Sequence, residues 1–258
     1  MDQGQLQEID QTVKGWLRDS RKFVLTKMAE KLNVAEKSSR KDLVTNVDKA
    51  NEQFLIERIR QFSPDSQILG EEGFGDKITE TSGWVWVVDP IDGTMNFVKQ
   101  QDHFATMIAL YIDGQGVLGY INDIMNDDLY SGGPQLGVFK NEQRLPAPAN
   151  LGLADGLIGI SGPLILRNQF NMQIVAEKSA GVRAYGSAGI EISHILSGKL
   201  NGYISYLKPW DFGAGKILAE TLGLSVTTVD GKPLGMLSSD FVMVATEKAQ
   251  RDILPIVG

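Results

Sequence analysis

The apolar residues near the start of the chain recur at the spacing of an α-helix. Between Leu6 and Leu32 they fall every three or four positions, which predicts a long amphipathic helix with a candidate break at Asp19-Ser20. The polar segment EKSSRK then predicts a loop. A second helix is expected from near Val44 to Ser63-Pro64, because proline marks a helix stop.

In the middle of the chain the spacing changes to that of β-strands. SQILGEEG predicts a short strand that ends in an acidic turn, and Trp84 to Val88 predicts a central strand because it is apolar on both faces. From Phe104 to Leu145, apolar runs are separated by turn residues such as Asp113-Gly114. This part of the chain therefore predicts an antiparallel meander.

The pattern changes again after Pro146, where strands and helices alternate. Strands are expected near 156–161, 182–185, 202–206 and 241–246, and helices over 164–179, 189–197, 211–222 and 247–257. Such alternation predicts layered α/β packing. A boundary at LPAPANLG divides the chain into an N-terminal α+β lobe, residues 1–146, and a C-terminal α/β lobe, residues 147–258.

Composition and charge exclude several classes of protein. The 258 residues carry a formal net charge of -7 and show no basic stripe, so nucleic-acid binding is not expected. The absence of cysteine excludes disulfides and agrees with a cytoplasmic location. The start, MDQGQLQEIDQTVKGW, is too polar for a signal peptide. Asp155 and Pro163 interrupt the longest apolar region, 151–166, so no membrane span is expected.

The motif WVWVVDPIDGTMNF ends a buried strand on two aspartates. One interpretation is a surface turn, because Asp-Pro and Asp-Gly are common turn dipeptides. The alternative is a cation site, because Asp89 continues a strand that is buried on both faces, where an unpaired carboxylate is costly. Mg²⁺ prefers oxygen ligands, so Asp89, Asp92 and the Ile91 carbonyl are candidates. Gly93 and Thr94 then offer backbone N–H groups to an anion.

Two further acidic positions are ambiguous on their own. Glu71 stands in a glycine-flanked turn, where glutamate usually faces solvent. Asp211 precedes FGAGKILAETLG and suits a helix N-cap, although a cap can also lie in the strand-helix crevice where α/β proteins bind ligands. Neither residue identifies a site by itself.

Three motifs, in the order GEEG, WVVDPIDGTMNF and KPWDFGAG, resemble those of the inositol monophosphatase family of Mg²⁺-dependent, lithium-sensitive phosphatases. The segment KSSRKDLVTNVD is similar to the family's segment before its second helix, and the likeness covers nearly the whole chain. The resemblance implies an α/β fold built as a layered αβαβα sandwich, usually assembled as a homodimer.

The resemblance also implies a set of metal ligands for two or three Mg²⁺ ions. Glu71, Asp89 and the Ile91 carbonyl would hold one ion. Asp89, Asp92 and Asp211 would hold a second. Glu71 would also help to hold a third, more weakly bound ion or its waters.

The remaining roles concern water and substrate. Thr94 and Asp48 match the pair that positions and deprotonates the attacking water, with Glu71 as a further catalytic residue, and Lys37 matches a lysine in a mobile loop near the metals. The positions implied to contact the substrate are Ile91, Asp92, Gly93, Thr94, Gly189, Ile190, Glu191, Ser205 and Asp211.

Elementary electrostatics supports this chemistry independently of the resemblance. A phosphate monoester dianion is repelled by clustered carboxylates unless metal ions reverse the local charge. Two metals about 3.5–4 Å apart can stabilise the attacking and leaving oxygens while activating water. Phosphoryl transfer needs positioning and charge stabilisation more than covalent catalysis. That requirement agrees with a chain that has no cysteine and two histidines.

The substrate is less well defined than the reaction. Glu191 stands where the animal enzymes have a small residue, Ser205 matches an inositol-binding glutamate only across a one-residue gap, and Lys99 replaces a common histidine. The leading hypothesis is a phosphatase for myo-inositol monophosphate or a similar small polyol phosphate. The alternative substrates are fructose 1,6-bisphosphate, a 3′-phosphoadenosine nucleotide and NADP. A hypothesis of another class is a regulatory partner of the transcription machinery.

Overall fold

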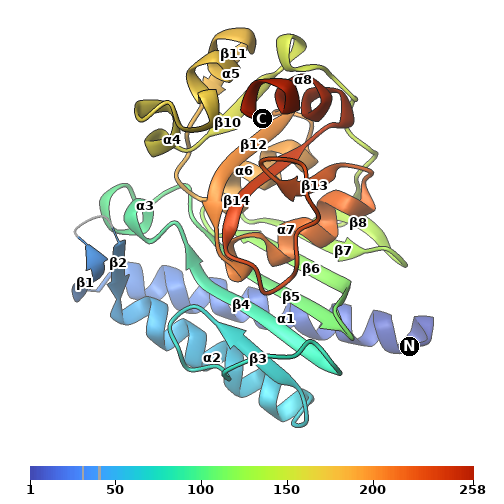
Figure 1. Ribbon diagram of the computed structural model, residues 1–258. Coiled ribbons are helices and arrows are strands. Elements are labelled where there is room, and N and C mark those ends of the chain that lie inside the picture. Colours follow the sequence, from blue (N-terminus) through green and yellow to red (C-terminus); the bar gives the residue numbers. More distant parts are fainter. Residues whose placement is uncertain (31, 40–41) are drawn as a thin grey trace.

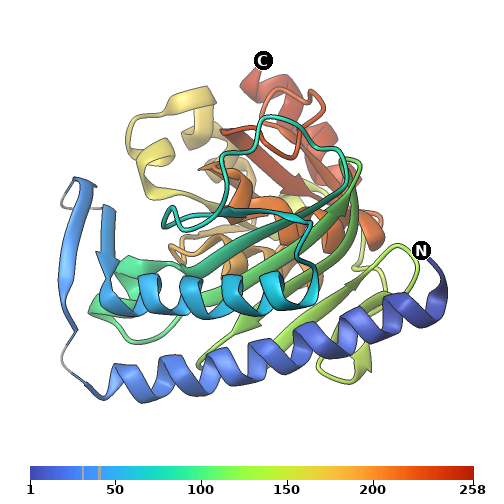
Figure 2. The same cartoon turned by 90° about the horizontal axis from the view of Figure 1, so that it is seen from below.

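The computed structural model describes residues 1–30, 32–39 and 42–258. Within these ranges the chain forms alternating layers of helix and sheet (Figure 1). The first layer holds two helices, α1 (Gln3–Met28) and α2 (Asn46–Phe62). Both helices lie along the same face of the larger sheet, as Figure 2 shows from below.

The larger sheet has the strand order β3-β4-β5-β6-β7-β8-β9 in the described part of the chain. Its strands are β3 (Gln67–Gly70), β4 (Trp84–Asp92), β5 (Ala105–Ile112), β6 (Gln115–Asp123), β7 (Asp128–Gly133), β8 (Gly137–Lys140) and β9 (Gln143–Arg144). β3 runs parallel to β4, and every later neighbour is antiparallel. The predicted meander and the short strand at SQILG are therefore confirmed.

Strand β4 is buried on both faces, as its sequence predicts. Trp86 and Val88 pack toward α1 and α2, whereas Val85 and Val87 belong to the cluster on the opposite face. The strand leaves regular pairing with β5 between Asp89 and Asp92, where the register shifts. A bulge of this kind re-aims side chains at a strand end. The helix α3 (Thr94–Lys99) follows at once.

The C-terminal half supplies a second sheet and two more helical layers. The strands are β10 (Leu157–Ile160), β11 (Gly181–Arg183), β12 (Gly202–Leu207), β13 (Ser225–Thr228) and β14 (Asp240–Ala245), in the order β11-β10-β12-β14-β13. The helices α6 (Ala188–Leu196) and α7 (Pro209–Thr221) pack between the two sheets. The outer layer contains α4 (Gly162–Leu166), α5 (Met172–Lys178) and α8 (Glu247–Val257), with short 3₁₀ turns at Leu153–Asp155 and Gln169–Asn171. The predicted αβαβα sandwich is confirmed.

Several local predictions were wrong. The helix α1 continues through Asp19-Ser20, because the hydroxyl of Ser20 donates to Asn51 Oδ1 of α2 (2.8 Å) and satisfies a buried polar group. Part of the expected EKSSRK loop is strand: β1 (Val34–Ser39) pairs with β2 (Asp42–Thr45), while residues 40–41 lie outside the described residues.

Two differences occur in the C-terminal half. The helix expected over 164–179 is divided into α4 and α5, because Asn168, Phe170 and Asn171 adopt left-handed backbone angles between them. The strand β13 has no counterpart among the expected elements, since its short sequence SVTT carries little apolar signal. In the described part of the chain, no helix combines the length and apolarity needed to cross a membrane. The lobe boundary after residue 146 stays a prediction.

Candidate active site

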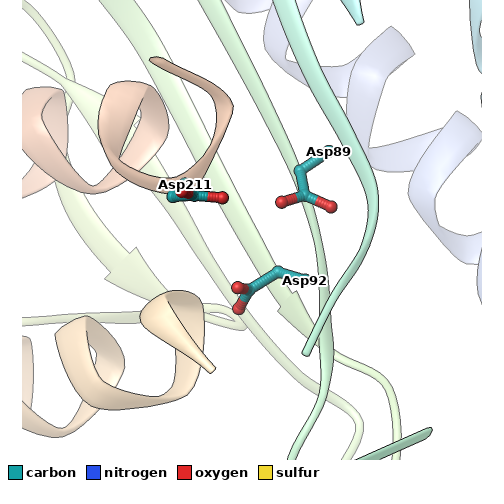
Figure 3. Close-up of side chains that lie close together, drawn as sticks. All are labelled: Asp89, Asp92 and Asp211. Atoms are coloured by element: carbon teal, nitrogen blue, oxygen red, sulfur yellow. The ribbon is translucent and has the colours of Figure 1, made fainter. Parts of the chain in front are cut away.

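Three aspartates converge where β4 meets α7: Asp89 and Asp92 are buried, and Asp211 is partly buried. Asp89 and Asp92 come from the end of β4, and Asp211 comes from the first turn of α7 (Figure 3). One carboxylate oxygen from each residue lies within 4.8 Å of the other two. A strand end and a helix start that are distant in sequence thus bring three carboxylates to one point.

The carboxylate of Asp89 lacks a hydrogen-bond partner among the described residues. Both of its oxygens are buried, and the residue is 1% exposed. Burial, together with the charges of Glu71, Asp92 and Asp211, raises the pKa of Asp89 well above the usual value. A buried carboxylate without donors needs a cation or a proton. Oxygen ligands at this spacing suit a hard divalent cation such as Mg²⁺, so the donor set fits the metal.

Asp92 is oriented by the start of α6. Its carboxylate accepts hydrogen bonds from the Ser187 hydroxyl, from the backbone N–H of Ala188 (3.0 Å) and from that of Gly189 (2.7 Å). Burial raises the pKa of Asp92 to about 6, although these donors oppose the shift. The donors occupy specific lone pairs and therefore set the direction of the carboxylate.

Asp211 lies inside α7 rather than before it. The helix begins at Pro209, so the N-cap prediction was wrong, and Lys208 occupies that position. Asp211 Oδ2 accepts the backbone N–H of Lys208 (2.7 Å) in a capping-box arrangement. Burial raises the pKa of Asp211 to about 8, with Asp92 and Glu71 as further causes.

A second capping box places Asp48 beside Thr94. Thr45 caps α2, and Asp48 Oδ2 accepts both the backbone N–H (3.0 Å) and the hydroxyl (2.5 Å) of Thr45. The other oxygen, Oδ1, accepts from Thr94 Oγ1 (2.9 Å). The Thr94 hydroxyl also lies 3.1 Å from the Ile91 carbonyl oxygen. Burial raises the pKa of Asp48, which makes its carboxylate a stronger base.

Glu71 and Lys37 lie at the open side of the site. Lys37 Nζ lies 2.9 Å from Glu71 Oε1 and 2.5 Å from Glu72 Oε1. The charge of Glu71 is the largest electrostatic cause of the raised pKa of Asp89 after burial, so the two carboxylates are neighbours. Glu71 therefore lies beside the aspartates and in contact with Lys37, although it does not belong to the group of three whose oxygens lie within 4.8 Å of one another.

A cavity of about 310 Å³ opens beside Asp92 and Asp211. Its described lining includes Ser187, Ala188, Glu191 and Ser205, but Gly189 and Ile190 do not belong to it. Ser187 and Ala188 escaped the sequence interpretation; the only available signal was a serine before a helical pattern, which favours an N-cap. A groove of about 840 Å³ lies elsewhere, between α1 and β7-β8, and contains none of the three aspartates.

Glu191 lines this cavity, but its carboxylate is held by the chain. Its Oε1 accepts the backbone N–H of Tyr185 (2.7 Å), while its Oε2 is buried. Burial raises the pKa of Glu191 to about 7. Contact between Glu191 and a substrate stays a prediction. The observed contact of its carboxylate is with the backbone of Tyr185, in the segment just before Ser187.

Comparison with known proteins defines the family. The model of the inositol monophosphatase family matches residues 5–257. The chain belongs to the inositol monophosphatase family. It is 37% identical to an inositol-1-monophosphatase of Bacillus subtilis, over 95% of both chains. It is 33% identical to Nus factor SuhB of Escherichia coli, over 81% of this chain and 80% of that protein.

A solved structure of the inositol monophosphatase family supports the metal interpretation. An IMPase/NADP phosphatase in complex with Mg²⁺ and phosphate superposes with a TM-score of 0.91 at 31% identity, covering 98% of this chain and 95% of the other. The family is metal-dependent, and membership makes this chain a phosphoric monoester hydrolase. The α/β fold class and the resemblance inferred from the motifs are confirmed.

The raised carboxylate pKa values predict how metal-free stability depends on pH. The pKa of Asp211 is about 8 when folded against about 3.9 when unfolded, so the folded state holds a proton that the unfolded chain releases. The associated stability is complete below about pH 4 and is lost as pH rises through about 8. We therefore expect the Tm of chelator-treated protein to fall between pH 6 and pH 8.5.

Mg²⁺ should reverse this loss because it binds the ionised carboxylates. At a hundredfold excess over the dissociation constant, the Tm should rise by roughly 5–10 °C at pH 8 and by less at pH 6. Thermal unfolding with chelator or Mg²⁺ across this range measures both effects. A Tm increase that does not change with pH would contradict the assignment of these carboxylates to the metal.

Proposed function

We propose that this chain hydrolyses myo-inositol monophosphate or a similar small polyol phosphate, with Mg²⁺ and an activated water. The observation that carries the proposal is the buried carboxylate of Asp89, which lacks a donor and faces Asp92 and Asp211. Glu71 and the Ile91 carbonyl are the other proposed ligands. When bound, two or three Mg²⁺ ions would neutralise these ligands, attract the phosphate and activate water.

The proposed proton path runs through Thr94 and Asp48. The Thr94 hydroxyl donates to Asp48 Oδ1, so its oxygen lone pairs remain available to accept a hydrogen bond from water. A proton taken from that water can pass to the carboxylate of Asp48, which burial has made more basic. We propose Glu71 as a further catalytic residue on the open side, where Lys37 balances its charge.

The cavity beside the aspartates suits an uncharged leaving group. Its described lining contains the hydroxyl-bearing residues Ser161, Ser187, Tyr203 and Ser205, and none of its described lining residues is lysine or arginine. Hydroxyl groups can donate to and accept from a polyol. A second phosphate or a pyrophosphate would lack a cationic partner there. We therefore favour a neutral polyol, with phosphate bound near Gly93 and Thr94.

A substrate panel tests this preference. We expect kcat/KM for myo-inositol monophosphate to exceed that for fructose 1,6-bisphosphate, a 3′-phosphoadenosine nucleotide and NADP by roughly tenfold or more, since one unpaired buried charge costs over 1 kcal/mol. Phosphate release with and without Mg²⁺ is the measurement. Faster turnover of NADP would contradict the polyol preference, and no release from any substrate would contradict the phosphatase proposal.

The remaining expectations stay predictions. A homodimer and a cytoplasmic location are both consistent with the family, and inhibition by Li⁺ is expected of the assembled site. A regulatory role beside the transcription machinery is the second candidate function, favoured by the 33% identity to Nus factor SuhB. A variant without catalytic activity separates the two functions, because only a regulatory role would survive the loss of Asp89.

A further inference from the structure

Helix α2 carries a buried acid that the proposed reaction does not use. Glu52 is 0% exposed and follows Asp48 by one helical turn, so both side chains lie on the same side of α2. The Glu52 carboxylate accepts the backbone N–H of Glu72 at Oε2 (2.5 Å) and that of Phe74 at Oε1 (3.1 Å). Glu52 thus holds the turn that follows β3.

The turn packs too closely on Glu52 to adopt another position easily. A Cβ atom added to Gly70 would lie 2.2 Å from Glu52 Oε1, so the absence of a side chain allows this approach. On the far side of the turn, a Cβ atom added to Gly75 would lie 2.4 Å from the Ile68 carbonyl oxygen. The backbone between these glycines is therefore confined between α2 and β3.

Glu71 lies inside this confined segment. Its preceding residue, Gly70, is in contact with the Glu52 carboxylate, and the N–H of its following residue, Glu72, is bonded to that carboxylate. The backbone that carries Glu71 is consequently held by Glu52, which is not itself a proposed metal ligand, while Lys37 contacts the Glu71 carboxylate. Groups that orient metal ligands in this way commonly change metal affinity by about 10–100-fold when they are replaced.

We propose that Glu52 is a positioning residue that fixes Glu71 for metal binding and couples it to Asp48 through one turn of α2. This inference rests on the proposed function, because it takes Glu71 as a metal ligand. The carboxylate has two acceptor oxygens for two N–H donors, a match that no neutral side chain of this length provides. A rigid connection between Asp48 and Glu71 would keep Asp48 and Thr94, the proposed water-activating pair, at a fixed position relative to the metal.

Two variants disturb the contact between Glu52 and the turn after β3, one from the side of α2 and the other from the side of the turn. Glu52→Gln keeps the size of the side chain but accepts at one atom only, and its NH₂ group opposes the second N–H donor. Gly70→Ala leaves the sequence of α2 unchanged. Its added methyl group would push the Glu52 carboxylate away from the turn. If one variant fails to fold, the other still tests the link. Ile59→Val is the matched control, because Ile59 is buried on the same helix and has an apolar side chain that packs in the core.

Calorimetric titration with Mg²⁺ is the first measurement. We expect the dissociation constant to rise about 10–100-fold in Glu52→Gln and Gly70→Ala, and to stay unchanged in Ile59→Val. A merely structural role would destabilise all three proteins without a selective loss of metal affinity. Wild-type Mg²⁺ affinity in both Glu52→Gln and Gly70→Ala would overturn the proposal.

Hydrogen exchange provides a readout that does not depend on metal or activity. The amides of Glu72 and Phe74 should exchange faster in Glu52→Gln, while amides in β5 keep their wild-type protection. Unchanged amide exchange at Glu72 and Phe74 would contradict the proposed role of Glu52 in holding the turn. If the wild-type protein binds no Mg²⁺, the proposed function and the role of Glu71 as a ligand fail, whereas faster exchange would still identify Glu52 as the residue that holds the turn.

Discussion

Replacing Asp89 with asparagine should abolish phosphate release while leaving the fold intact. Asp89 faces Asp92, Asp211 and Glu71, so it is placed to serve both of the proposed metals. Loss of this ligand removes several kcal/mol of transition-state stabilisation, equivalent to roughly a thousandfold or more in turnover. Because asparagine is neutral without taking up a proton, whereas folding at neutral pH must protonate Asp89 in its buried position, the metal-free variant should also have a higher Tm than the wild-type protein at pH 7.

Phosphate release at saturating Mg²⁺ and thermal unfolding in chelator are the two measurements. Asp65→Asn is a suitable control, because Asp65 is exposed and undergoes the same chemical change away from the site. Near-normal Mg²⁺-dependent turnover in Asp89→Asn would exclude a ligand shared by two metals. A lower metal-free Tm would show that the carboxylate is paired in a way that the geometry does not reveal.

Replacing Thr94 with alanine should lower turnover far more than it lowers Mg²⁺ affinity. The Thr94 hydroxyl bridges the Ile91 carbonyl and Asp48 but is not a proposed metal ligand. In the proposed mechanism Asp48 would then lose its connection to the attacking water, and general-base assistance is worth about 10²–10⁴-fold in rate. We expect kcat to fall within that range and the Mg²⁺ dissociation constant to change by less than about threefold, which is under 1 kcal/mol.

Steady-state kinetics and calorimetric Mg²⁺ titration distinguish these two effects. Thr26→Ala serves as the control, because Thr26 is exposed on α1 and bonds only to its own helix. A large loss of Mg²⁺ binding with unchanged kcat would assign Thr94 to the metal rather than to the proton path.

The sequence predicted the layers because burial leaves a strong periodic signal. The alternation of Val85, Trp86, Val87 and Val88 between two cores follows directly from the pleat of β4. The aspartates were also recognisable, since a carboxylate at the end of a fully buried strand conflicts with its surroundings. The capping box formed by Thr45 and Asp48 has a sequence signature as well, but it had been interpreted only through the family resemblance.

Contacts made by backbone groups could not be predicted in this way. Asp92 is held mainly by amides of α6, and Glu52 binds two amides of a turn about 20 residues further along the chain. Such donors are present at every residue except proline, so no residue type marks them. The β1–β2 ribbon was missed for a related reason: both strands are short, and residues 34–37 of β1 are exposed, so pairing rather than burial defines β1.

The five-layer architecture has a consequence for the order in which the molecule assembles. The meander β5–β9 involves neighbouring segments, but α7 must pack between the sheets before Asp211 reaches Asp89. We therefore expect electrostatic repulsion at the site to arise late in folding, when α7 packs against the larger sheet. A divalent cation would then act as a late folding ligand, favouring the closed molecule over a partly assembled one whose central apolar face is still exposed.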